Sequence, residues 1–319
     1  MSYLQAIVIA LVQGVTELFP VSSLGHSVLV PAWFGGSWQT LVTQSSQGDS
    51  GSSFYLAYIV ALHCATAVAL LWYFRDDWIR IIRGFLRSLP RSLRSRELVL
   101  EDADERLAWL IVVATIPVGI TGLALEHVFR TIFAKPLAAS IFLVVNGVIL
   151  LAAEWTRRRD EAADAVVAGA DHSGGGARSA EDIALARASD ARIARVSFRD
   201  GTFVGVLQVA ALLPGISRSG ITMAGGLWRG LSHEDAVRFA FLLATPVIFA
   251  AGVLKIPSLF GPAGDDIHGQ VVVGVIVCGL AAYASIRFLV RYFETRTLRP
   301  FAVYCLVAGA ASIIRFAAF

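Results

Sequence analysis

The sequence predicts an all-α polytopic membrane protein with about six transmembrane helices and two re-entrant helical hairpins, arranged as an inverted repeat. Three observations lead to this fold class. The 319 residues are 56% hydrophobic and only 16% charged, too little charge for the surface of a soluble domain. Several apolar runs reach the roughly 20 residues that a helix needs to cross a bilayer. Two further apolar stretches are interrupted by proline, glycine and serine.

The uninterrupted apolar runs are expected to be ordinary transmembrane helices. They cover residues 54–74, 108–126, 137–153, 236–254, 270–290 and 300–318. The interrupted stretches, residues 3–34 and 202–230, contain Pro20 and Pro214. Interior proline breaks a helix, and irregular backbone at membrane depth is tolerated only where it is buried in protein or lines a wet cavity. We therefore expect both stretches to enter the membrane, turn and leave on the same side.

The loops predict the orientation of the chain. Residues 75–96 and 157–195 are rich in arginine and are expected to face the cytoplasm, whereas residues 35–53 contain no Lys or Arg and are expected outside. The segment 157–195, rich in Ala, Gly, Asp and Arg, is predicted to be a flexible linker. It would join a first repeat, residues 1–153, to a second, inverted repeat, residues 200–319, within one membrane domain.

The two interrupted stretches also resemble each other in sequence. Ser23 follows Pro20 by three residues, and Ser217 follows Pro214 by the same spacing. In inverted-repeat membrane proteins the functional site forms where the two broken helices meet. We therefore expect the polar residues of both interruptions to lie side by side.

Composition and motifs exclude several classes of function. Cys64, Cys278 and Cys305 lie in apolar runs without a CxxC pair, which indicates neither a disulfide framework nor a zinc site. The net charge of +3, with arginine concentrated in loops, indicates membrane topology and anionic headgroups rather than nucleic acid. The sequence contains no GxxxxGK[ST], HExxH or dinucleotide-binding motif.

The first interruption carries a polar cluster within QGVTELFPVSSLGH. Gln13 and Glu17 are four residues apart and share one helix face. An ionisable group at membrane depth is expensive, so the Glu17 carboxylate is a functional candidate. Ser22 and Ser23 are either reactive hydroxyls or N-caps of the returning helix. His26 is either an acid–base group or a packed core histidine.

The second interruption carries the motif PGISRSGIT. Gly215 and Gly220 permit tight backbone, and Arg218 supplies a planar cationic fork suited to phosphate oxygens. Hydroxyl groups are offered by Ser217, Ser219 and Thr222. The returning helix would also direct free N–H groups towards an anion. The alternative is an interfacial arginine on a Gly/Ser turn.

Together the two motifs supply an anion clamp, hydroxyl groups, an acid–base histidine and a carboxylate able to hold a hard cation. Phosphoryl transfer needs mainly positioning and charge neutralisation, so the set predicts phosphoryl chemistry. For His63, another ionisable residue at membrane depth, core packing and a role in the cavity are equally open.

At these motifs the sequence resembles the undecaprenyl-diphosphate phosphatases, the bacitracin-resistance family of bacterial inner membranes. The signatures of that family are (E/Q)xxxE running into PVSSxGH, and PGxSRSxxT, and both are complete here. The resemblance covers nearly the whole chain. Gln13 stands where some members have Glu, and Leu24 replaces the usual Ser or Thr.

The resemblance implies hydrolysis of undecaprenyl diphosphate to undecaprenyl phosphate and inorganic phosphate, which recycles the lipid carrier of cell-wall synthesis and confers bacitracin resistance. It also implies a requirement for Mg²⁺ or Ca²⁺ and an active site reached from the periplasmic side of the inner membrane. Membrane lipids are further expected partners, nucleic acid is not expected, and a homodimer is left open.

A mechanistic hypothesis combines the residues with the resemblance. Arg218 would clamp the diphosphate, and Glu17 with Gln13 would hold the divalent cation. Ser23 would attack the terminal phosphorus while His26 handles the proton, although these two roles are exchangeable. Substrate contacts are expected from Gln13, Ser22, Gly215, Ser217, Ser219, Gly220 and Thr222.

Three other readings compete with the phosphatase. A secondary transporter or lipid flippase shares the architecture, but it has less need of a Ser/His pair beside an arginine. A membrane acid phosphatase would need a lysine–arginine element and a later histidine that the second motif lacks. A structural scaffold would leave both polar clusters unexplained.

Overall fold

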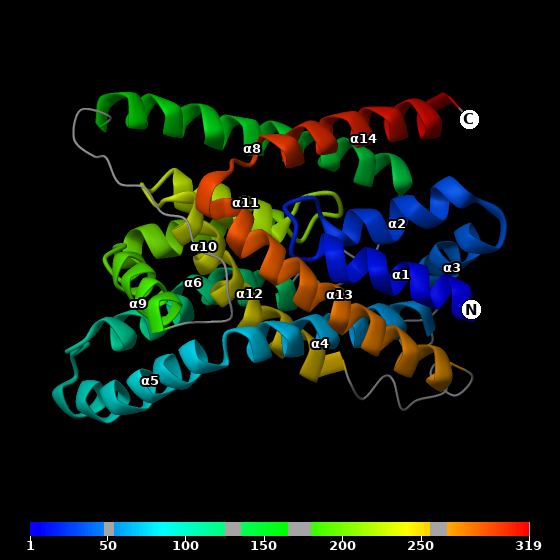
Figure 1. Cartoon of the computed structure of the whole chain (residues 1–319). Helices are drawn as coiled ribbons and strands as arrows, with labels where there is room; N and C mark the ends of the chain where they lie inside the picture. Colours follow the sequence, from blue (N-terminus) through cyan, green and yellow to red (C-terminus); the bar gives the residue numbers. More distant parts are fainter. Residues whose placement is uncertain (48–53, 125–134, 165–179, 256–266, 319) are drawn as a thin grey trace.

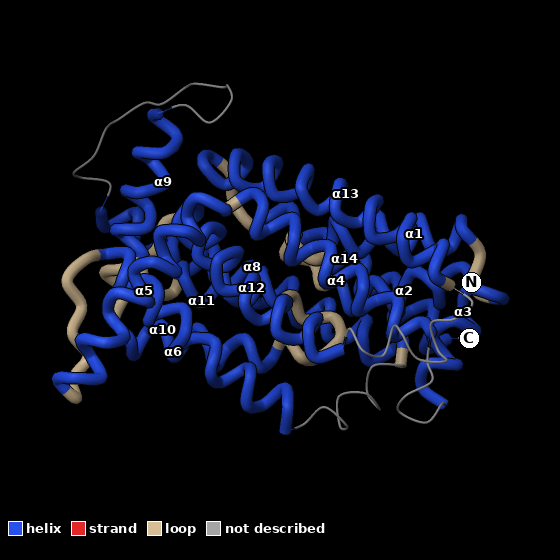
Figure 2. The backbone as a smooth tube through the Cα atoms, turned by 90° about the horizontal axis from the view of Figure 1, so that it is seen from below, coloured by secondary structure: helices blue, strands red, loops and turns tan. Residues whose placement is uncertain are grey.

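The computed structural model describes residues 1–47, 54–124, 135–164, 180–255 and 267–318, and in these ranges it contains helices and no strand (Figure 2). The predicted all-α class is therefore confirmed. The helices are α1 (Tyr3–Thr16), α2 (Ser23–Phe34), α3 (Gly36–Gln47), α4 (Phe54–Tyr73), α5 (Arg75–Ser95), α6 (Ala103–Ala124), α8 (Pro136–Asp164), α9 (Ala180–Ile193), α10 (Phe198–Ala210), α11 (Arg218–Leu227), α12 (His233–Lys255), α13 (His268–Thr295) and α14 (Arg299–Ala318).

Five of the helices in the described ranges are long and apolar enough to cross a membrane: α6, α8, α12, α13 and α14. They coincide with five of the six predicted spans. The sixth, residues 54–74, forms α4, which meets the same criterion only together with α5, across a bend of 85°. The chain therefore has up to six membrane spans in its described part.

Residues 75–96, predicted to be a loop, form the helix α5 instead. Its buried residues Asp77, Ile81, Gly84 and Ser88 recur every three or four positions and so form one helix face. That face packs on α6, where the Trp109 indole N–H donates to Ser88 Oγ at 2.9 Å. The many arginines of this segment led to the loop prediction. They lie instead on the other faces of an amphipathic helix.

Two further loop predictions need correction. Residues 36–47 of the predicted outer loop form α3, and residues 48–53 lie outside the described part. The predicted linker 157–195 begins inside α8 and ends with α9, while residues 165–179 are not described. Buried Asp190 anchors α9 through ion pairs with Arg80 and Arg238, which composition alone did not indicate. Part of the predicted linker is therefore helical, and its flexibility stays a prediction.

Both interrupted stretches are broken helices. The first break, residues 17–22, separates α1 from α2, and the second, residues 211–217, separates α10 from α11. α1 packs on α13 and α10 packs on α6, while α8 and α14 run side by side along one face of the molecule (Figure 1). In each case the first helix of one half packs on a helix of the other half, as an inverted repeat would require. The repeat symmetry and the re-entrant course of the hairpins stay predictions.

The hydrophobic core holds the two breaks in place. Its largest cluster joins residues from α4, α6, α12, α13 and α14, with Phe239, Phe241 and Phe293 fully buried. Leu18 of the first break and Met223 of α11 belong to the same cluster. Apolar packing thus fixes the first break and α11 against one body of helices, while Ala211 and Ile216 of the second break pack in a smaller cluster.

Candidate active site

The two breaks are joined directly through Ser22. This residue is the N-cap of α2, and its Oγ accepts the N–H of Gly25 at 3.2 Å and the N–H of Gly215 at 3.1 Å. A Cβ added at Gly25 would lie 3.0 Å from the Cα of Gly215, so glycine at this position favours the close approach of the two breaks. Ser22 also adopts a φ of 70°, which is uncommon for a residue with a side chain. The N-cap interpretation of Ser22 is therefore confirmed.

Asn146 of α8 forms a second link between the breaks, and the sequence analysis missed it. Its Nδ2 donates to the Pro20 carbonyl at 2.9 Å, and its Oδ1 accepts the N–H of Ser217 at 2.9 Å. The side chain is fully buried. A single amide thus satisfies one backbone group in each break. The available signal was a lone polar residue inside an apolar span.

The hydroxyls of the second motif face the first break. Ser219 Oγ donates to the Phe19 carbonyl at 3.1 Å and lies 3.0 Å from Ser217 Oγ. Ser217 Oγ also caps α11 by accepting the N–H of Gly220 at 3.1 Å. In this arrangement both serines hold the breaks together. Thr222 Oγ1, in contrast, is buried without a hydrogen-bond partner in the described part of the chain.

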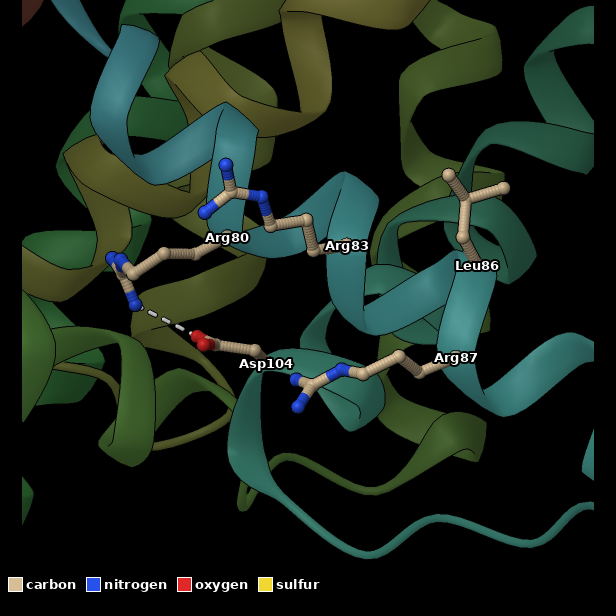
Figure 3. A pocket seen from close by; sticks show the side chains of 5 residues that line it. All are labelled: Arg80, Arg83, Leu86, Arg87 and Asp104. Atoms are coloured by element: carbon tan, nitrogen blue, oxygen red, sulfur yellow. Dashed lines mark hydrogen bonds and ion pairs between the residues drawn. The ribbon is translucent and has the colours of Figure 1, made fainter.

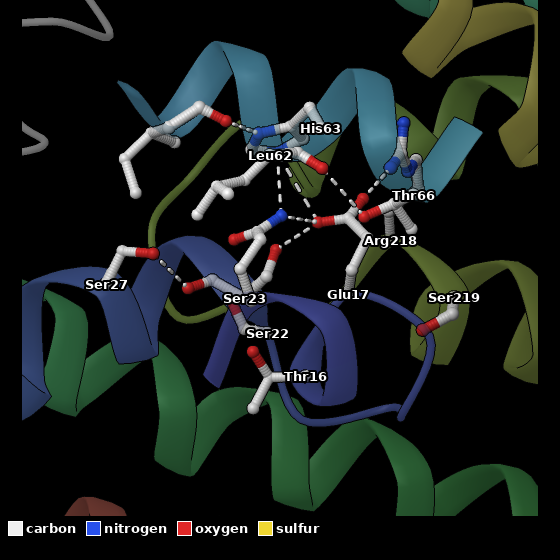
Figure 4. Close-up of polar contacts among 12 residues, drawn as sticks. Thr16, Glu17, Ser22, Ser23, Ser27, Leu62, His63, Thr66, Arg218 and Ser219 are labelled. Atoms are coloured by element: carbon white, nitrogen blue, oxygen red, sulfur yellow. Dashed lines mark hydrogen bonds and ion pairs between the residues drawn. The ribbon is translucent and has the colours of Figure 1, made fainter. Parts of the chain in front are cut away.

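The two motifs meet at the carboxylate of Glu17, which lies directly after the last residue of α1 (Figure 4). Glu17 Oε1 forms an ion pair with Arg218, the first residue of α11. Glu17 Oε2 accepts the N–H of Gln13 at 2.9 Å and the hydroxyl of Ser23. The Glu17 side chain is 3% exposed and that of Arg218 is 18% exposed, so the arginine remains reachable. The structure therefore brings Gln13, Glu17, Ser23 and Arg218 into one cluster.

His63 of α4 completes this cluster. Its Nδ1 lies 2.8 Å from the Ile59 carbonyl, which can only accept, so Nδ1 carries a proton. The opposite nitrogen, Nε2, lies 3.4 Å from Glu17 Oε2 and 3.3 Å from Gln13 Nε2 (Figure 4). His63 therefore contacts the polar residues of this cluster and does not pack against apolar side chains alone.

His26 is placed differently from the other predicted catalytic residues. Its Nδ1 lies 2.7 Å from the Ser22 carbonyl and its Nε2 lies 2.7 Å from the hydroxyl of Tyr304 on α14. The two rings stack with centroids 5.7 Å apart. Because the carbonyl can only accept, Nδ1 carries the proton and Nε2 accepts from the tyrosine. In the described part of the chain, the hydrogen-bond partners of the His26 ring are therefore the Ser22 carbonyl and Tyr304, and not the Ser23 hydroxyl.

The donor atoms for a cation are few in this cluster. The described residues contain no group of three or more His, Cys, Asp or Glu that could hold a metal ion. Gln13 Oε1 is nevertheless buried without a hydrogen-bond partner in the described part of the chain, next to the Glu17 carboxylate. A carboxylate and an amide oxygen are ligands that hard cations accept, and Mg²⁺ commonly takes its remaining ligands from water and substrate phosphates. The residues present fit a cation completed by the substrate, not one held by protein alone.

Comparison with known proteins places the chain in a family. A family model described as bacitracin resistance protein BacA matches residues 6–311. The chain belongs to this family. It is 56% identical to undecaprenyl-diphosphatase 2 of Frankia alni, over 99% of this chain and 98% of the relative. It is 55% identical to undecaprenyl-diphosphatase of Mycolicibacterium paratuberculosis, over 98% and 97%. With undecaprenyl-diphosphatase 2 of Burkholderia ambifaria it shares 41% identity, over 94% and 92%. The BacA family is the one that the sequence motifs indicated.

Proposed function

We propose that this BacA protein hydrolyses undecaprenyl diphosphate to undecaprenyl phosphate and inorganic phosphate, and so recycles the lipid carrier of cell-wall synthesis and confers bacitracin resistance. The names of its relatives support this activity and give no support to the transporter or flippase alternative. The observation that carries the proposal is the Glu17 carboxylate, which contacts Ser23 of its own hairpin and Arg218 of the other.

Arg218 is the proposed anchor of the diphosphate. It is the first residue of α11, and both a guanidinium group and a helix N-terminus favour an anion. In the structure, the guanidinium of Arg218 forms an ion pair with the carboxylate of Glu17. A phosphate oxygen would replace that carboxylate, because the arginine is partly exposed whereas Glu17 is buried. Substrate binding would thereby free Glu17 to act as a base.

Ser23 is the proposed nucleophile, since its hydroxyl already donates to Glu17. The Ser23 Oγ would attack the terminal phosphorus and pass its proton to Glu17. The bond from phosphorus to the bridging oxygen would break, and undecaprenyl phosphate would leave. Water would then cleave the phosphoserine to give inorganic phosphate and restore the hydroxyl. The contacts of His26 favour this assignment over His26 as nucleophile.

A divalent cation, Mg²⁺ or Ca²⁺, is proposed at Glu17 and at the neighbouring Gln13 Oε1, which has no hydrogen-bond partner among the described residues. The cation would neutralise charge on the diphosphate oxygens. Gln13 itself positions the carboxylate by donating from Nε2 at 2.9 Å, so its two amide atoms would serve two different purposes.

The proposed location of the protein is supported by its apolar helices and by its family. Its apolar spans fit a multi-pass membrane protein. We propose the bacterial inner membrane, with the headgroup in the Glu17–Arg218 cluster and the prenyl chain along apolar helix faces. The resemblance to the family adds the proposal that the site opens to the periplasmic side.

The test is phosphate release from undecaprenyl diphosphate by purified protein in detergent, with and without EDTA. Glu17→Gln and Arg218→Ala are measured alongside, each after a folding check by thermal melting. We expect release that EDTA and both substitutions abolish. Folded wild-type protein that releases no phosphate with Mg²⁺ or Ca²⁺ present would overturn the proposed function, and release that survives EDTA would overturn the cation.

A further inference from the structure

The helix α5 differs in direction and in charge from α4, the apolar helix before it. It turns by 85° from the α4 segment Ala57–Tyr73 and carries Arg75, Asp76, Asp77, Arg80 and further arginines within 21 residues. A helix with this charge is too expensive to place across the hydrocarbon core. A helix that is strongly charged on one face and apolar on another lies in the interface plane of a membrane.

The outer face of α5 carries an exposed apolar stripe, defined as Ile79, Ile82, Leu86 and Leu93. These side chains are 46%, 50%, 60% and 71% exposed. Their spacing of three, four and seven residues places them on one side of the helix, opposite the buried face that packs on α6. Because no described helix covers it, this stripe is the part of α5 that can enter the acyl-chain region.

Arginines follow one edge of the apolar stripe. Arg83, Arg87 and Arg94 each come one residue after a member of the stripe, so they lie on the same side of it. No described acidic residue pairs with Arg83, and Arg87 pairs at 2.9 Å with Asp102, where both side chains are more than 40% exposed. An exposed pair of this kind is weak and exchanges its partners readily. Both guanidinium groups are therefore available to an external anion.

Arg83 and Arg87 line a groove between α5 and the start of α6 (Figure 3). The groove has a volume of about 400 Å³, and its other lining residues are Arg80, Leu86 and Asp104. Arg80 and Asp104 pair with each other at 2.7 Å, so their charges are already matched. The groove thus combines two further cationic groups with the exposed side chain of Leu86, which suits a ligand that is anionic at one end and apolar at the other.

We infer that this groove binds the headgroup of an anionic membrane phospholipid. The phosphate would lie between Arg83 and Arg87, with an acyl chain along Leu86 and the apolar stripe. Guanidinium groups suit phosphate oxygens, and arginines near a membrane surface favour anionic lipid. The groove lies on α5 and α6, whereas the Glu17–Arg218 cluster is built from other helices, so the lipid would be a second ligand, distinct from the proposed substrate.

The experiment measures lipid binding to the full chain in detergent by native mass spectrometry, with phosphatidylglycerol and phosphatidylcholine of identical acyl chains. The double variant Arg83→Gln/Arg87→Gln is compared with Arg195→Gln/Arg199→Gln, which removes two other exposed arginines. We expect phosphatidylglycerol binding to weaken about 30-fold in the first variant and to be unchanged in the second. Arg83→Lys/Arg87→Lys, which keeps the charge, is expected to retain most of the binding and serves as the folding control.

Two outcomes would overturn the inference. Equal binding of both lipids by the wild type, or equal loss in both glutamine variants, would show that the groove has no particular role. Displacement of phosphatidylglycerol by inorganic phosphate, beyond that caused by chloride at the same ionic strength, would show a site for free anions instead. Hydrolysis of undecaprenyl diphosphate is measured separately, so either result leaves the proposed phosphatase untouched.

Discussion

The protein contains two buried clusters of charge that differ in how their charges are matched. Between α5, α6, α9 and α12, Asp77, Asp104 and Asp190 surround two arginines, Arg80 and Arg238, with ion pairs of 2.6–3.0 Å. In the Glu17–Arg218 cluster, one carboxylate contacts one arginine, a serine hydroxyl, an amide N–H and the imidazole of His63. Among the described residues, the first cluster offers each arginine two or more carboxylates, whereas the second offers Arg218 one.

This difference indicates a structural role for the first cluster and a functional role for the Glu17–Arg218 cluster. Arg238 is held by two carboxylates and is almost completely buried, so it cannot exchange partners without opening the fold. Arg218 has one carboxylate partner and remains partly exposed, so an incoming phosphate can take its place. We therefore expect substitutions in the first cluster to lower stability and those in the second to lower activity.

The largest effect is expected at Ser23. Ser23→Ala removes the proposed nucleophile, and phosphate release should fall about 10³-fold or more, equivalent to roughly 4 kcal/mol of the activation barrier. The melting temperature should change little, because alanine fits the same space. Ser27→Ala is the matched control, since this neighbouring hydroxyl donates only to the Ser23 carbonyl within its own helix. An active Ser23→Ala protein would remove serine from the mechanism.

The second effect concerns stability. Asp190→Asn leaves the buried Arg238 with a weakened partner, and we expect the free energy of unfolding to drop by about 3–5 kcal/mol. Chemical denaturation in detergent measures this loss, and protein that remains folded should keep its phosphatase activity. Asp76→Asn is the control, because its pair with Arg75 at 3.8 Å is exposed and contributes less than about 1 kcal/mol. Equal losses in the two variants would contradict the structural role of the first cluster.

A smaller effect on both quantities is expected at Asn146. Asn146→Leu leaves the Pro20 carbonyl and the Ser217 N–H without their partner, which costs about 1–3 kcal/mol for each buried group. Because this residue holds the two breaks in register, kcat should fall together with stability. Ser140→Ala on the same helix removes only a bond to the Pro136 carbonyl and should be nearly neutral. An Asn146→Leu protein with unchanged kcat would show that the register of the breaks does not depend on this amide.

The smallest effect is expected at Tyr304. Tyr304→Phe removes the hydroxyl that donates to His26 and keeps the ring stacked on it, so activity should fall less than tenfold, equivalent to about 1 kcal/mol. If His26 were the nucleophile, loss of this bond would alter the pH profile of kcat strongly. A profile that stays unchanged supports the assignment of Ser23, and a large shift would favour His26.

The sequence predicted the residues of the Glu17–Arg218 cluster because charged residues are unusual in apolar stretches. A carboxylate three residues before an interior proline and an arginine flanked by two serines are conspicuous in apolar stretches. His63 and Asn146 were harder to place, since a single polar residue in a span does not reveal which element its side chain faces. The pairing of His26 with Tyr304 joins residues 278 positions apart, so no local pattern could show it.

The errors in the fold have a common physical cause. Residues 75–96 and 180–193 are polar enough to look like loops, yet each forms a helix whose few buried residues contact another element. Tertiary ion pairs such as Asp190 with Arg238 stabilise these helices, and their partners lie far away in the sequence. Apolar spans were predicted well because hydrophobicity alone determines them.

The central claim is that Glu17 and Arg218 act together in one site although they belong to opposite halves of the chain. The most direct measurement is a double-mutant cycle on phosphate release with Glu17→Asp, Arg218→Lys and the combined variant, chosen so that activity remains measurable. We predict that the combined loss falls well short of the product of the two single losses, because residues that act as a unit are not additive. Losses that simply multiply would show two independent residues and contradict the account.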